Sequence, residues 1–427
     1  MTSNVLRISS LIFPLLIFKI NLFISGFWRI DMLRSIILSI FGLCWFLCNR
    51  QNFLATFKRE GSKLEVRIIA IFILLILCFR RIEPLNFLIA VEIMNLPMIF
   101  AILNYSKDLD KYSAVLFMFF FNLIGSIPFM ISRWPIIFAF KVIDENWSSY
   151  LRSFVLAMAI FLILCCKLPV YILHFWLTKA HVRSFGVGSM LLASLILKIG
   201  TTGMFKFNFF LPSFIIIKIS TISWTLVSGT ICAFFIFHFL DLKQMVAYSS
   251  VVHMAFILPM SLLAGVVERV SRMIVMVRHG VTSLVLFFLV TLTYEAHWNR
   301  RLIINKSSQV IGGNFYFWLI IYLLINLGFP PFARFLREVL FIHTILKRAA
   351  RWSTFFFFSL VISRLYLFAS LIMIIFSKND TIVGIEWKKN MTTSMILTFS
   401  SLIFLVWSMI FCSPSLNKTL LCGSKNI

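Results

Sequence analysis

The chain has 427 residues, of which 61% are hydrophobic and 13% are charged, and its formal net charge at pH 7 is +25. This composition excludes an ordinary soluble domain, in which about a quarter of the residues are charged. A large positive charge on a soluble protein would suggest nucleic-acid binding. Here the Lys and Arg residues lie mostly near the ends of apolar segments, which favours anchoring at a membrane surface and predicts no nucleic-acid partner.

Apolar segments of about 20 residues recur along the whole chain, a pattern typical of an all-α, polytopic transmembrane helical bundle. The first segment lacks the small-residue cleavage site of a signal peptide, so we interpret it as a span. Residues 209–220 form an apolar linker that could also belong to a neighbouring span. In chain order we expect about 13 spans, at residues 9–27, 33–48, 66–82, 84–104, 113–132, 150–178, 187–208, 221–240, 243–263, 272–294, 315–348, 353–376 and 392–411.

Two of these segments are unusually long and contain prolines that predict breaks. The Lys-Leu-Pro sequence at 167–169 interrupts the segment 150–178, and the double proline at 330–331 interrupts the segment 315–348. Proline removes a backbone donor, and in a bilayer the freed carbonyl groups need water or polar side chains. Two broken helices are typical of transporters with internal repeats, whereas each break alone could be an ordinary proline kink.

Four ionisable residues lie inside apolar segments: Glu92, Lys167, Lys198 and Glu338. Each costs about 2.5–3.5 kcal/mol at the centre of a membrane unless it is paired or hydrated. A carboxylate and an amine in one pocket stabilise each other's charged forms, whereas burial alone favours the neutral forms. Moving one partner away would therefore switch the amine between holding and releasing a proton, so these residues predict a proton relay.

Three histidines fit the same hypothesis: His174, His253 and His279. His174 follows Lys167 by seven residues, about two turns along one helix face. Imidazole titrates near neutrality and can pass a proton from one ring nitrogen to the other. The alternative for each histidine is a packed, hydrogen-bonded structural residue. We assign no role to four basic residues that are placed to snorkel at span ends, namely Lys19, Arg133, Lys218 and Lys243.

The sequence has no motif for a nucleotide, a metal or a redox group. It lacks a Walker sequence and the GxGxxG pattern, so no phosphate-binding loop is expected. Its eight cysteines include no CxxC pair and lie mostly in apolar segments, as small buried hydrophobic residues do. We therefore expect no cofactor in this chain.

Several motifs occur in a specific order. KLPVYILHFWLTKAH at 167–181 is followed by GSMLLASLILKIG at 188–200, DLKQMVAYSSVVHMAF at 241–256, RHGVTSLVLFF at 278–288 and INLGFPPFARFLREVLF at 325–341. Together they resemble the signature of the chain-4 family of mitochondrial NADH:ubiquinone oxidoreductase, respiratory complex I. The resemblance covers about residues 85–375 and carries little signal in the terminal segments.

The resemblance implies a fold and a role for each candidate residue. The family has two inverted five-helix repeats, which implies N-terminal spans at 1–83, repeats at 84–208 and 209–378, and a C-terminal span and tail at 379–427. The glutamate that Glu92 matches pairs with the broken-helix lysine that Lys167 matches. By the same matching, Lys198 is the central lysine, Glu338 faces the exit, and the hydrophilic axis contains His174, His253 and His279.

The resemblance also implies a function. The chain would be a subunit of proton-translocating NADH:ubiquinone reductase, taking part in proton translocation coupled to electron transfer from NADH to ubiquinone. NADH, FMN and iron–sulfur clusters belong to other subunits. The implied partners are other membrane-arm subunits, including neighbouring antiporter-like subunits, within the lipid bilayer of the mitochondrial inner membrane. Two alternatives stay open: a cation/proton antiporter subunit of the same fold, and a non-pumping scaffold.

The chain departs from the family at three arginines. The family's loop sequence PKAHxEAP is TKAHVRSF at 178–185, which introduces Arg183 and leaves Lys179 as the loop lysine near the membrane surface. Arg278 and Arg337 stand beside two candidate relay residues, where the family usually has small residues. One hypothesis is structural or regulatory pairing. The other is translation under the wrong code, because some animal mitochondria read AGA and AGG as serine, and +25 would then overstate the charge.

Overall fold

A computed structural model of the chain describes residues 66–71, 73–75, 84–106, 108–133, 155, 158–207, 215–239, 241–262, 266–297, 313–328, 338, 354, 357–365 and 368–369. Within these ranges the regular elements are helices. The spans predicted at 9–27, 33–48 and 392–411 lie outside the described residues, as does the double proline at 330–331.

The described helices match most of the predicted spans in their part of the chain. Four of them are long and apolar enough to cross a membrane: Phe87–Tyr105, Lys111–Ile131, Gly186–Met204 and Val275–Glu295. Shorter helical segments include Met158–Lys167 and residues 357–365. The labelled elements are α4 Pro84–Tyr105, α5 Lys111–Arg133, α8 Phe175–Arg183, α9 Gly186–Leu191, the π-helix η2 Leu192–Ile196, α10 Leu197–Phe207, α11 Ile215–Ile236, α12 Leu242–Ala255, α13 Ile257–Leu262, α14 Val266–His297 and α15 Gly313–Leu327.

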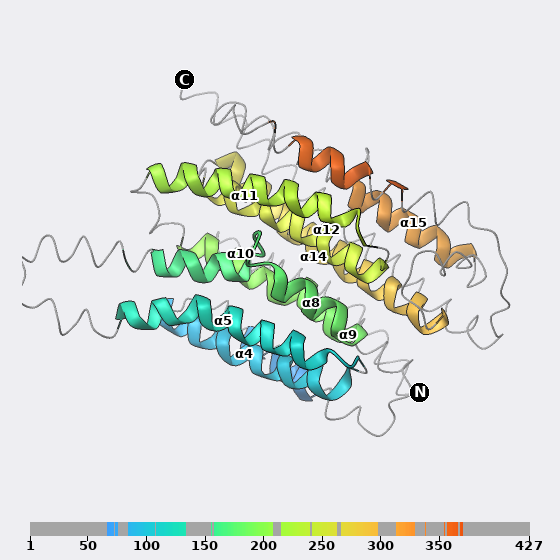
Figure 1. Cartoon of the computed structure of the whole chain (residues 1–427), viewed down its shortest axis with the longest axis horizontal. Helices are drawn as coiled ribbons and strands as arrows, with labels where there is room; N and C mark the ends of the chain where they lie inside the picture. The colour runs from blue at the N-terminus through green and yellow to red at the C-terminus, as the bar shows by residue number, and fades with distance from the viewer. Residues whose placement is uncertain are drawn as a thin grey trace, which may run out of the picture.

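Helix α14 lies at the centre of the bundle. It contacts α9, η2, α10, α12, α13 and α15, while α4 and α5 pair along one edge (Figure 1). The apolar windows of α14 and of residues 186–204 are fully buried, as expected for helices that are hydrophobic on all sides. Helix α4 instead keeps an exposed apolar stripe of a kind that lipid can cover, formed by Ile89, Ile93, Leu96 and Phe100.

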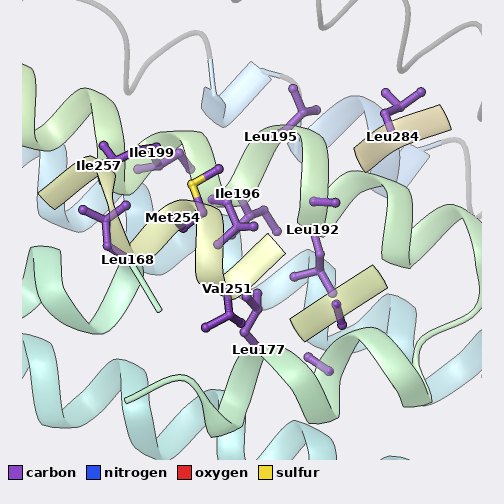
Figure 2. Packing of buried hydrophobic residues seen from close by; sticks show 14 of the residues in the cluster. Leu168, Leu177, Leu192, Leu195, Ile196, Ile199, Val251, Met254, Ile257 and Leu284 are labelled. Carbon is purple, nitrogen blue, oxygen red and sulfur yellow. The ribbon is translucent and has the colours of Figure 1, made fainter. Parts of the chain in front are cut away.

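Apolar side chains from helices far apart in the sequence interdigitate in the core (Figure 2). Leu168 and Ile196 lie close to Met254 and Ile257, and all four side chains are buried. Because interiors are close-packed, this contact fixes the relative position of the polar side chains that the same helices carry.

The predicted break at 167–169 is present. The helix Met158–Lys167 ends at the lysine, a turn follows, and α8 begins at Phe175. The indole Nε1 of Trp176 donates to the Cys166 carbonyl at 2.9 Å, which satisfies a carbonyl at the broken end. Within the turn, Ile172 has a φ of 76°, a conformation that is strained for a β-branched residue.

Two local predictions differ from the structure. The span predicted at 243–263 is interrupted at Phe256 between α12 and α13. Pro259 explains this interruption, because its ring would clash with the carbonyl of residue 255 in a continuous helix. Lys179 lies on α8 rather than in a loop. Of the two readings of residues 209–220, the structure favours membership of a neighbouring span from Ile215 onwards, where α11 begins.

Candidate functional site

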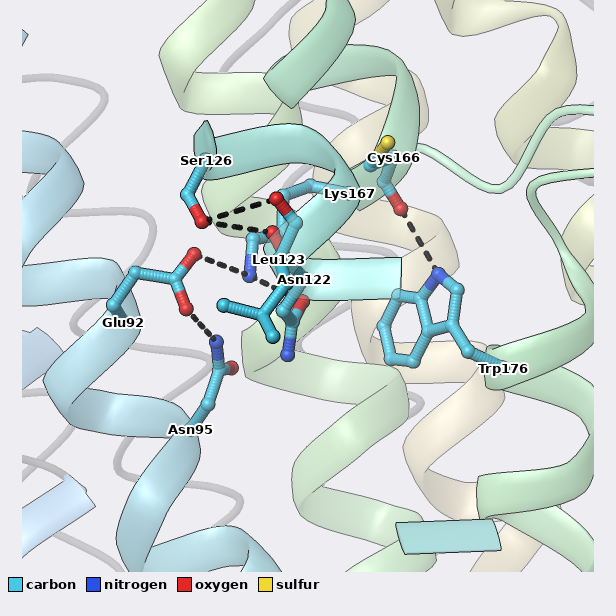
Figure 3. Close-up of polar contacts among 8 residues, drawn as sticks. All are labelled: Glu92, Asn95, Asn122, Leu123, Ser126, Cys166, Lys167 and Trp176. Carbon is cyan, nitrogen blue, oxygen red and sulfur yellow. Dashed lines mark hydrogen bonds and ion pairs between the residues drawn. The ribbon is translucent and has the colours of Figure 1, made fainter. Parts of the chain in front are cut away.

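The structure brings Glu92 of α4 and Lys167 together at the broken end of a helix. The Lys167 Nζ atom lies 3.8 Å from Glu92 Oε1, and it donates to Asn122 Oδ1 on α5 at 2.7 Å (Figure 3). The second Glu92 oxygen, Oε2, accepts from Asn95 Nδ2 at 3.4 Å. The amine is only 4% exposed, so these oxygen atoms supply the compensation that a buried ammonium needs.

Close helix packing makes this contact possible. A Cβ atom added at Gly125 of α5 would stand 3.3 Å from Cys166 Cβ, so glycine lets the two helices approach. Asn122 lies three residues before this glycine and therefore on the same side of α5. A Cβ at Gly200 of α10 would likewise stand 3.1 Å from Lys167 Cβ, so a second helix passes directly against the break.

A second polar cluster joins α10, α12 and α14. Lys198 Nζ lies 2.8 Å from His279 Nδ1, and the rings of His279 and His253 are 6.1 Å apart. An ammonium that donates to Nδ1 places the imidazole proton on Nε2. All three side chains are buried, so the cluster aligns one amine and two imidazoles inside the bundle.

The π-helix η2 supplies a further contact for the Lys198 amine, which donates to the Ala193 carbonyl at 3.0 Å. A π turn shifts the backbone pairing to i→i+5, and single π turns inside helices are frequent at functional sites. The irregular turn therefore places a backbone oxygen within reach of a buried amine.

His174 lies in the turn before α8, apart from both clusters, and is fully buried. Its ring stacks with Tyr171 and Phe175 at centroid distances of 5.7 Å and 4.5 Å, and Tyr248 approaches edge-on at 5.7 Å. The described neighbours of this imidazole are thus aromatic, an arrangement that suits the packed structural alternative as well as a relay.

Glu338 is buried and forms an ion pair with Arg364 Nη2 from the helical residues 357–365. This arginine comes from a different part of the chain than Arg337, which lies outside the described residues. The carboxyl group at the predicted exit therefore faces a cation that the sequence analysis did not single out.

Two buried residues were missed. The Lys243 amine donates to the Ser184 carbonyl at 2.5 Å and is 5% exposed, so it does not snorkel. His181 is fully buried against Phe287, with ring centroids 4.6 Å apart and nearly parallel planes, and neither of its ring nitrogens has a hydrogen-bond partner among the described residues. Both stand within the motifs quoted above, and that is the signal that could have found them.

The arginine that replaces the family's acid has a partner in the structure. Arg183 Nη2 lies 2.5 Å from Asp110 Oδ2, and both side chains are partly exposed. A surface pair of this kind contributes at most about 1 kcal/mol. Among the described residues, no group of three His, Cys, Asp or Glu side chains could hold a metal ion.

Comparisons with known proteins identify the family. The model of the family described as "NADH:quinone oxidoreductase/Mrp antiporter, TM" matches residues 83–365. NADH-ubiquinone oxidoreductase chain 4 of Artemia franciscana is 29% identical over 299 residues, which cover 70% of this chain and 75% of that protein.

Solved structures share the fold. A chain of respiratory complex I from Thermus thermophilus aligns with a TM-score of 0.68 and 17% identity, covering 92% of this chain and 93% of that one. A chain of an archaeal membrane-bound sulfane sulfur reductase aligns with a TM-score of 0.77 and 16% identity, covering 97% and 91%. The chain is therefore an all-helical membrane protein that belongs to the NADH:quinone oxidoreductase/Mrp antiporter family, as its motifs predict.

Proposed function

We infer that this chain is the chain-4, antiporter-like subunit of NADH:ubiquinone oxidoreductase in the mitochondrial inner membrane. Its role is proton translocation coupled to electron transfer from NADH to ubiquinone. The observation that carries the proposal is the buried Lys167 amine, which lies between the Glu92 carboxylate and the Asn122 amide. The order of the sequence motifs and the likeness to chain 4 of Artemia franciscana support the same assignment.

The proposed mechanism uses the two polar clusters as successive proton carriers. While Glu92 is ionised and close, the Lys167 amine retains its proton, because opposite charges favour each other's charged forms. Separation of the pair weakens that attraction and releases the proton. The Lys198 amine and the two imidazoles of His279 and His253 then form a chain in which each group can accept and donate a proton.

The remaining predicted residues take roles on the same path. We propose that Glu338 is the exit group, and that His174, Lys243 and His181 extend the buried axis beyond the two clusters. The electron-transfer groups, which are NADH, FMN, iron–sulfur clusters and ubiquinone, belong to other subunits, and we assign no redox step to this chain.

The proposed architecture has about 13 spans and two inverted five-helix repeats, at 84–208 and 209–378, each with a broken helix. Residues 1–83 add N-terminal spans, and residues 379–427 add a C-terminal span and tail. The partners are other membrane-arm subunits, including antiporter-like neighbours, and bilayer lipid, which suits the exposed apolar stripe on α4.

A cation/proton antiporter subunit is the second candidate, because the matching family includes Mrp antiporters. Purification of the chain from native membranes distinguishes the two. Recovery with flavin-containing and ubiquinone-reducing subunits supports the first function, whereas recovery in a complex without them supports the second. A non-pumping scaffold is the third candidate, and the pairing of Glu338 with Arg364 favours it.

Substitution of two lysines tests proton translocation. In the assembled complex, we expect Lys167→Met to lower coupled turnover about tenfold or more, as loss of a proton carrier does. Lys179→Met is the matched control, because this exposed amine lies over the Phe117 ring at 3.5 Å and outside both polar clusters. Equal effects of the two substitutions, or unchanged pumping in Lys167→Met, would contradict the proposal.

A further inference from the structure

Two oxygen atoms close to the Lys167 ammonium differ in charge and in distance. It hydrogen-bonds the neutral Asn122 amide at 2.7 Å, while the charged Glu92 oxygen stands farther away at 3.8 Å. A separation of 3.8 Å lies beyond hydrogen-bond range, so the carboxylate acts through Coulomb attraction alone. The Glu92 Oε1 atom is buried and has no hydrogen-bond partner among the described residues.

The position of Asn122 is fixed by its helix. Gly125 brings α5 against the Lys167 helix, and Asn122 itself is 5% exposed. The neighbouring Ser126 hydroxyl donates to the backbone carbonyl groups of Asn122 at 3.1 Å and of Leu123 at 3.4 Å (Figure 3). It therefore leaves the Asn122 side-chain amide free to bind Lys167. The asparagine side chain has fewer rotatable bonds than the lysine side chain, so the amide oxygen is the less mobile of the two partners.

The two acceptors would hold a proton on the amine with different strength. Both bonds would have a charged donor, but the carboxylate adds the attraction of a full opposite charge, which the amide oxygen lacks. An ammonium–carboxylate hydrogen bond is also shorter than the distance seen here. An ammonium in contact with Glu92 would keep its proton, whereas one held on an amide oxygen is more easily discharged. The distance between the amine and Glu92 thus decides how readily the proton leaves.

We propose that Asn122 is a positioning residue that holds the Lys167 amine away from Glu92 and so keeps this ion pair openable. The inference rests on the proposed function, and it adds Asn122 of α5 to the residues that control the pair of Glu92 and Lys167. The amide provides a second resting position, about 1 Å from contact with the carboxylate, and the amine exchanges between the two positions as the charge state changes.

Charged and polar groups approach the amine from several of the helices around it. Glu92 approaches from α4, and Asn122 from α5. Trp176 of α8 donates to the neighbouring Cys166 carbonyl, and the Cys166 thiol is the adjacent titratable group on the same helix. Lys198 of α10 directs its amine to His279 instead. The Asn122 amide is thus a neutral acceptor that competes with Glu92.

Two substitutions at this position test the inference in the assembled complex. Asn122→Asp places a second carboxylate at hydrogen-bond distance from the amine. We expect the alkaline limb of the pH profile of proton pumping to shift to higher pH by about one unit. We also expect slower turnover at neutral pH. Asn122→Leu removes the acceptor at similar size. We expect a structure of that complex to show the distance from Lys167 Nζ to Glu92 shortened to about 2.8 Å.

Two further variants make the result decisive. Ser126→Ala is the matched control on α5, because its hydroxyl donates to backbone carbonyl groups of its own helix. We expect the pH profile of this variant to equal that of the wild type. Lys167→Met reports on the proposed function itself. If Lys167→Met abolishes pumping while both Asn122 variants keep the wild-type pH profile and the 3.8 Å separation, the positioning role is wrong and the proposed function stands.

Discussion

The Lys198 and His279 side chains are 81 residues apart in sequence and meet with 2.8 Å between Nζ and Nδ1. One comes from α10 and the other from the centre of α14, so the contact joins the two proposed repeats. Because both side chains are buried, the bond is protected from water and its strength is that of a low-dielectric environment.

Substitution of His279 separates hydrogen bonding from proton transfer. His279→Asn retains an acceptor close to the position of Nδ1 but cannot carry a proton, and His279→Leu retains neither property. We expect coupled turnover to fall about tenfold or more in both variants, because each removes the imidazole that we propose as a proton carrier. The measurement is proton pumping per NADH oxidised in sealed membranes. Wild-type pumping by His279→Asn would show that the imidazole is only an acceptor.

The Trp176 indole stabilises the broken helix by satisfying the Cys166 carbonyl. Trp176→Phe keeps the aromatic ring and removes the donor, which leaves a buried carbonyl unpaired at a cost of about 1–3 kcal/mol. We expect lower thermal stability of the assembled complex, measured as loss of activity on heating. Trp224, which is only partly buried on α11, offers the control substitution Trp224→Phe. Equal stability of the two variants would contradict this role.

Ile172 in the turn between the two half-helices is a site of backbone strain. Its φ of 76° costs a β-branched residue about 1–3 kcal/mol, whereas glycine adopts this conformation freely. We expect Ile172→Gly to raise thermal stability by about 1 kcal/mol, since the side chain is 55% exposed and its loss leaves no cavity. Leu173→Gly, next to it but without a positive φ, is expected to lower stability. A loss of stability in both variants would show that the backbone at Ile172 is not strained.

The ion pair between Glu338 and Arg364 predicts an effect on stability. Removal of the guanidinium leaves a buried carboxyl group without its partner, which costs about 1–3 kcal/mol. We expect Arg364→Gln to lower the thermal stability of the assembled complex, measured as loss of activity on heating. Unchanged stability of Arg364→Gln would show that the pair contributes nothing to the fold.

Mass spectrometry of the mature protein decides whether the unusual arginines are real. The peptide covering residues 335–341 reports on Arg337, and the same experiment reports on Arg364, the partner of Glu338, where we expect arginine. Serine at either position would support decoding of AGA and AGG as serine and would lower the true net charge.

Much of the fold could be predicted, because apolar length and proline are local signals. The bounds of α4 and α5 follow from their apolar residues, and the break after Lys167 follows from Pro169. The interruption at Phe256 was missed although Pro259 lies within the same span, because one proline in an apolar run also fits a continuous, kinked helix.

The polar partners were harder to predict. Asn122 is one of several neutral polar residues in apolar helices. Its neighbours in the sequence do not indicate that it contacts a lysine 45 positions away. Lys243 lies at the start of a helix. The sequence pattern there is the same for a lysine that snorkels to the membrane surface and for one that is buried. The partners of Arg183 and Glu338 likewise depend on how distant helices pack, which no local pattern encodes.

The π turn at Leu192–Ile196 has a consequence for variation in this helix. Each residue of an α-helix advances the side-chain direction by about 100°. The π turn takes up one extra residue within a wider turn, so deleting one residue there would restore regular winding and leave the two flanking halves nearly in register. The Ala193 carbonyl, which now accepts from the Lys198 amine, would return to a backbone N–H four residues along the chain. The extra residue of this helix thus frees a backbone acceptor for a buried amine.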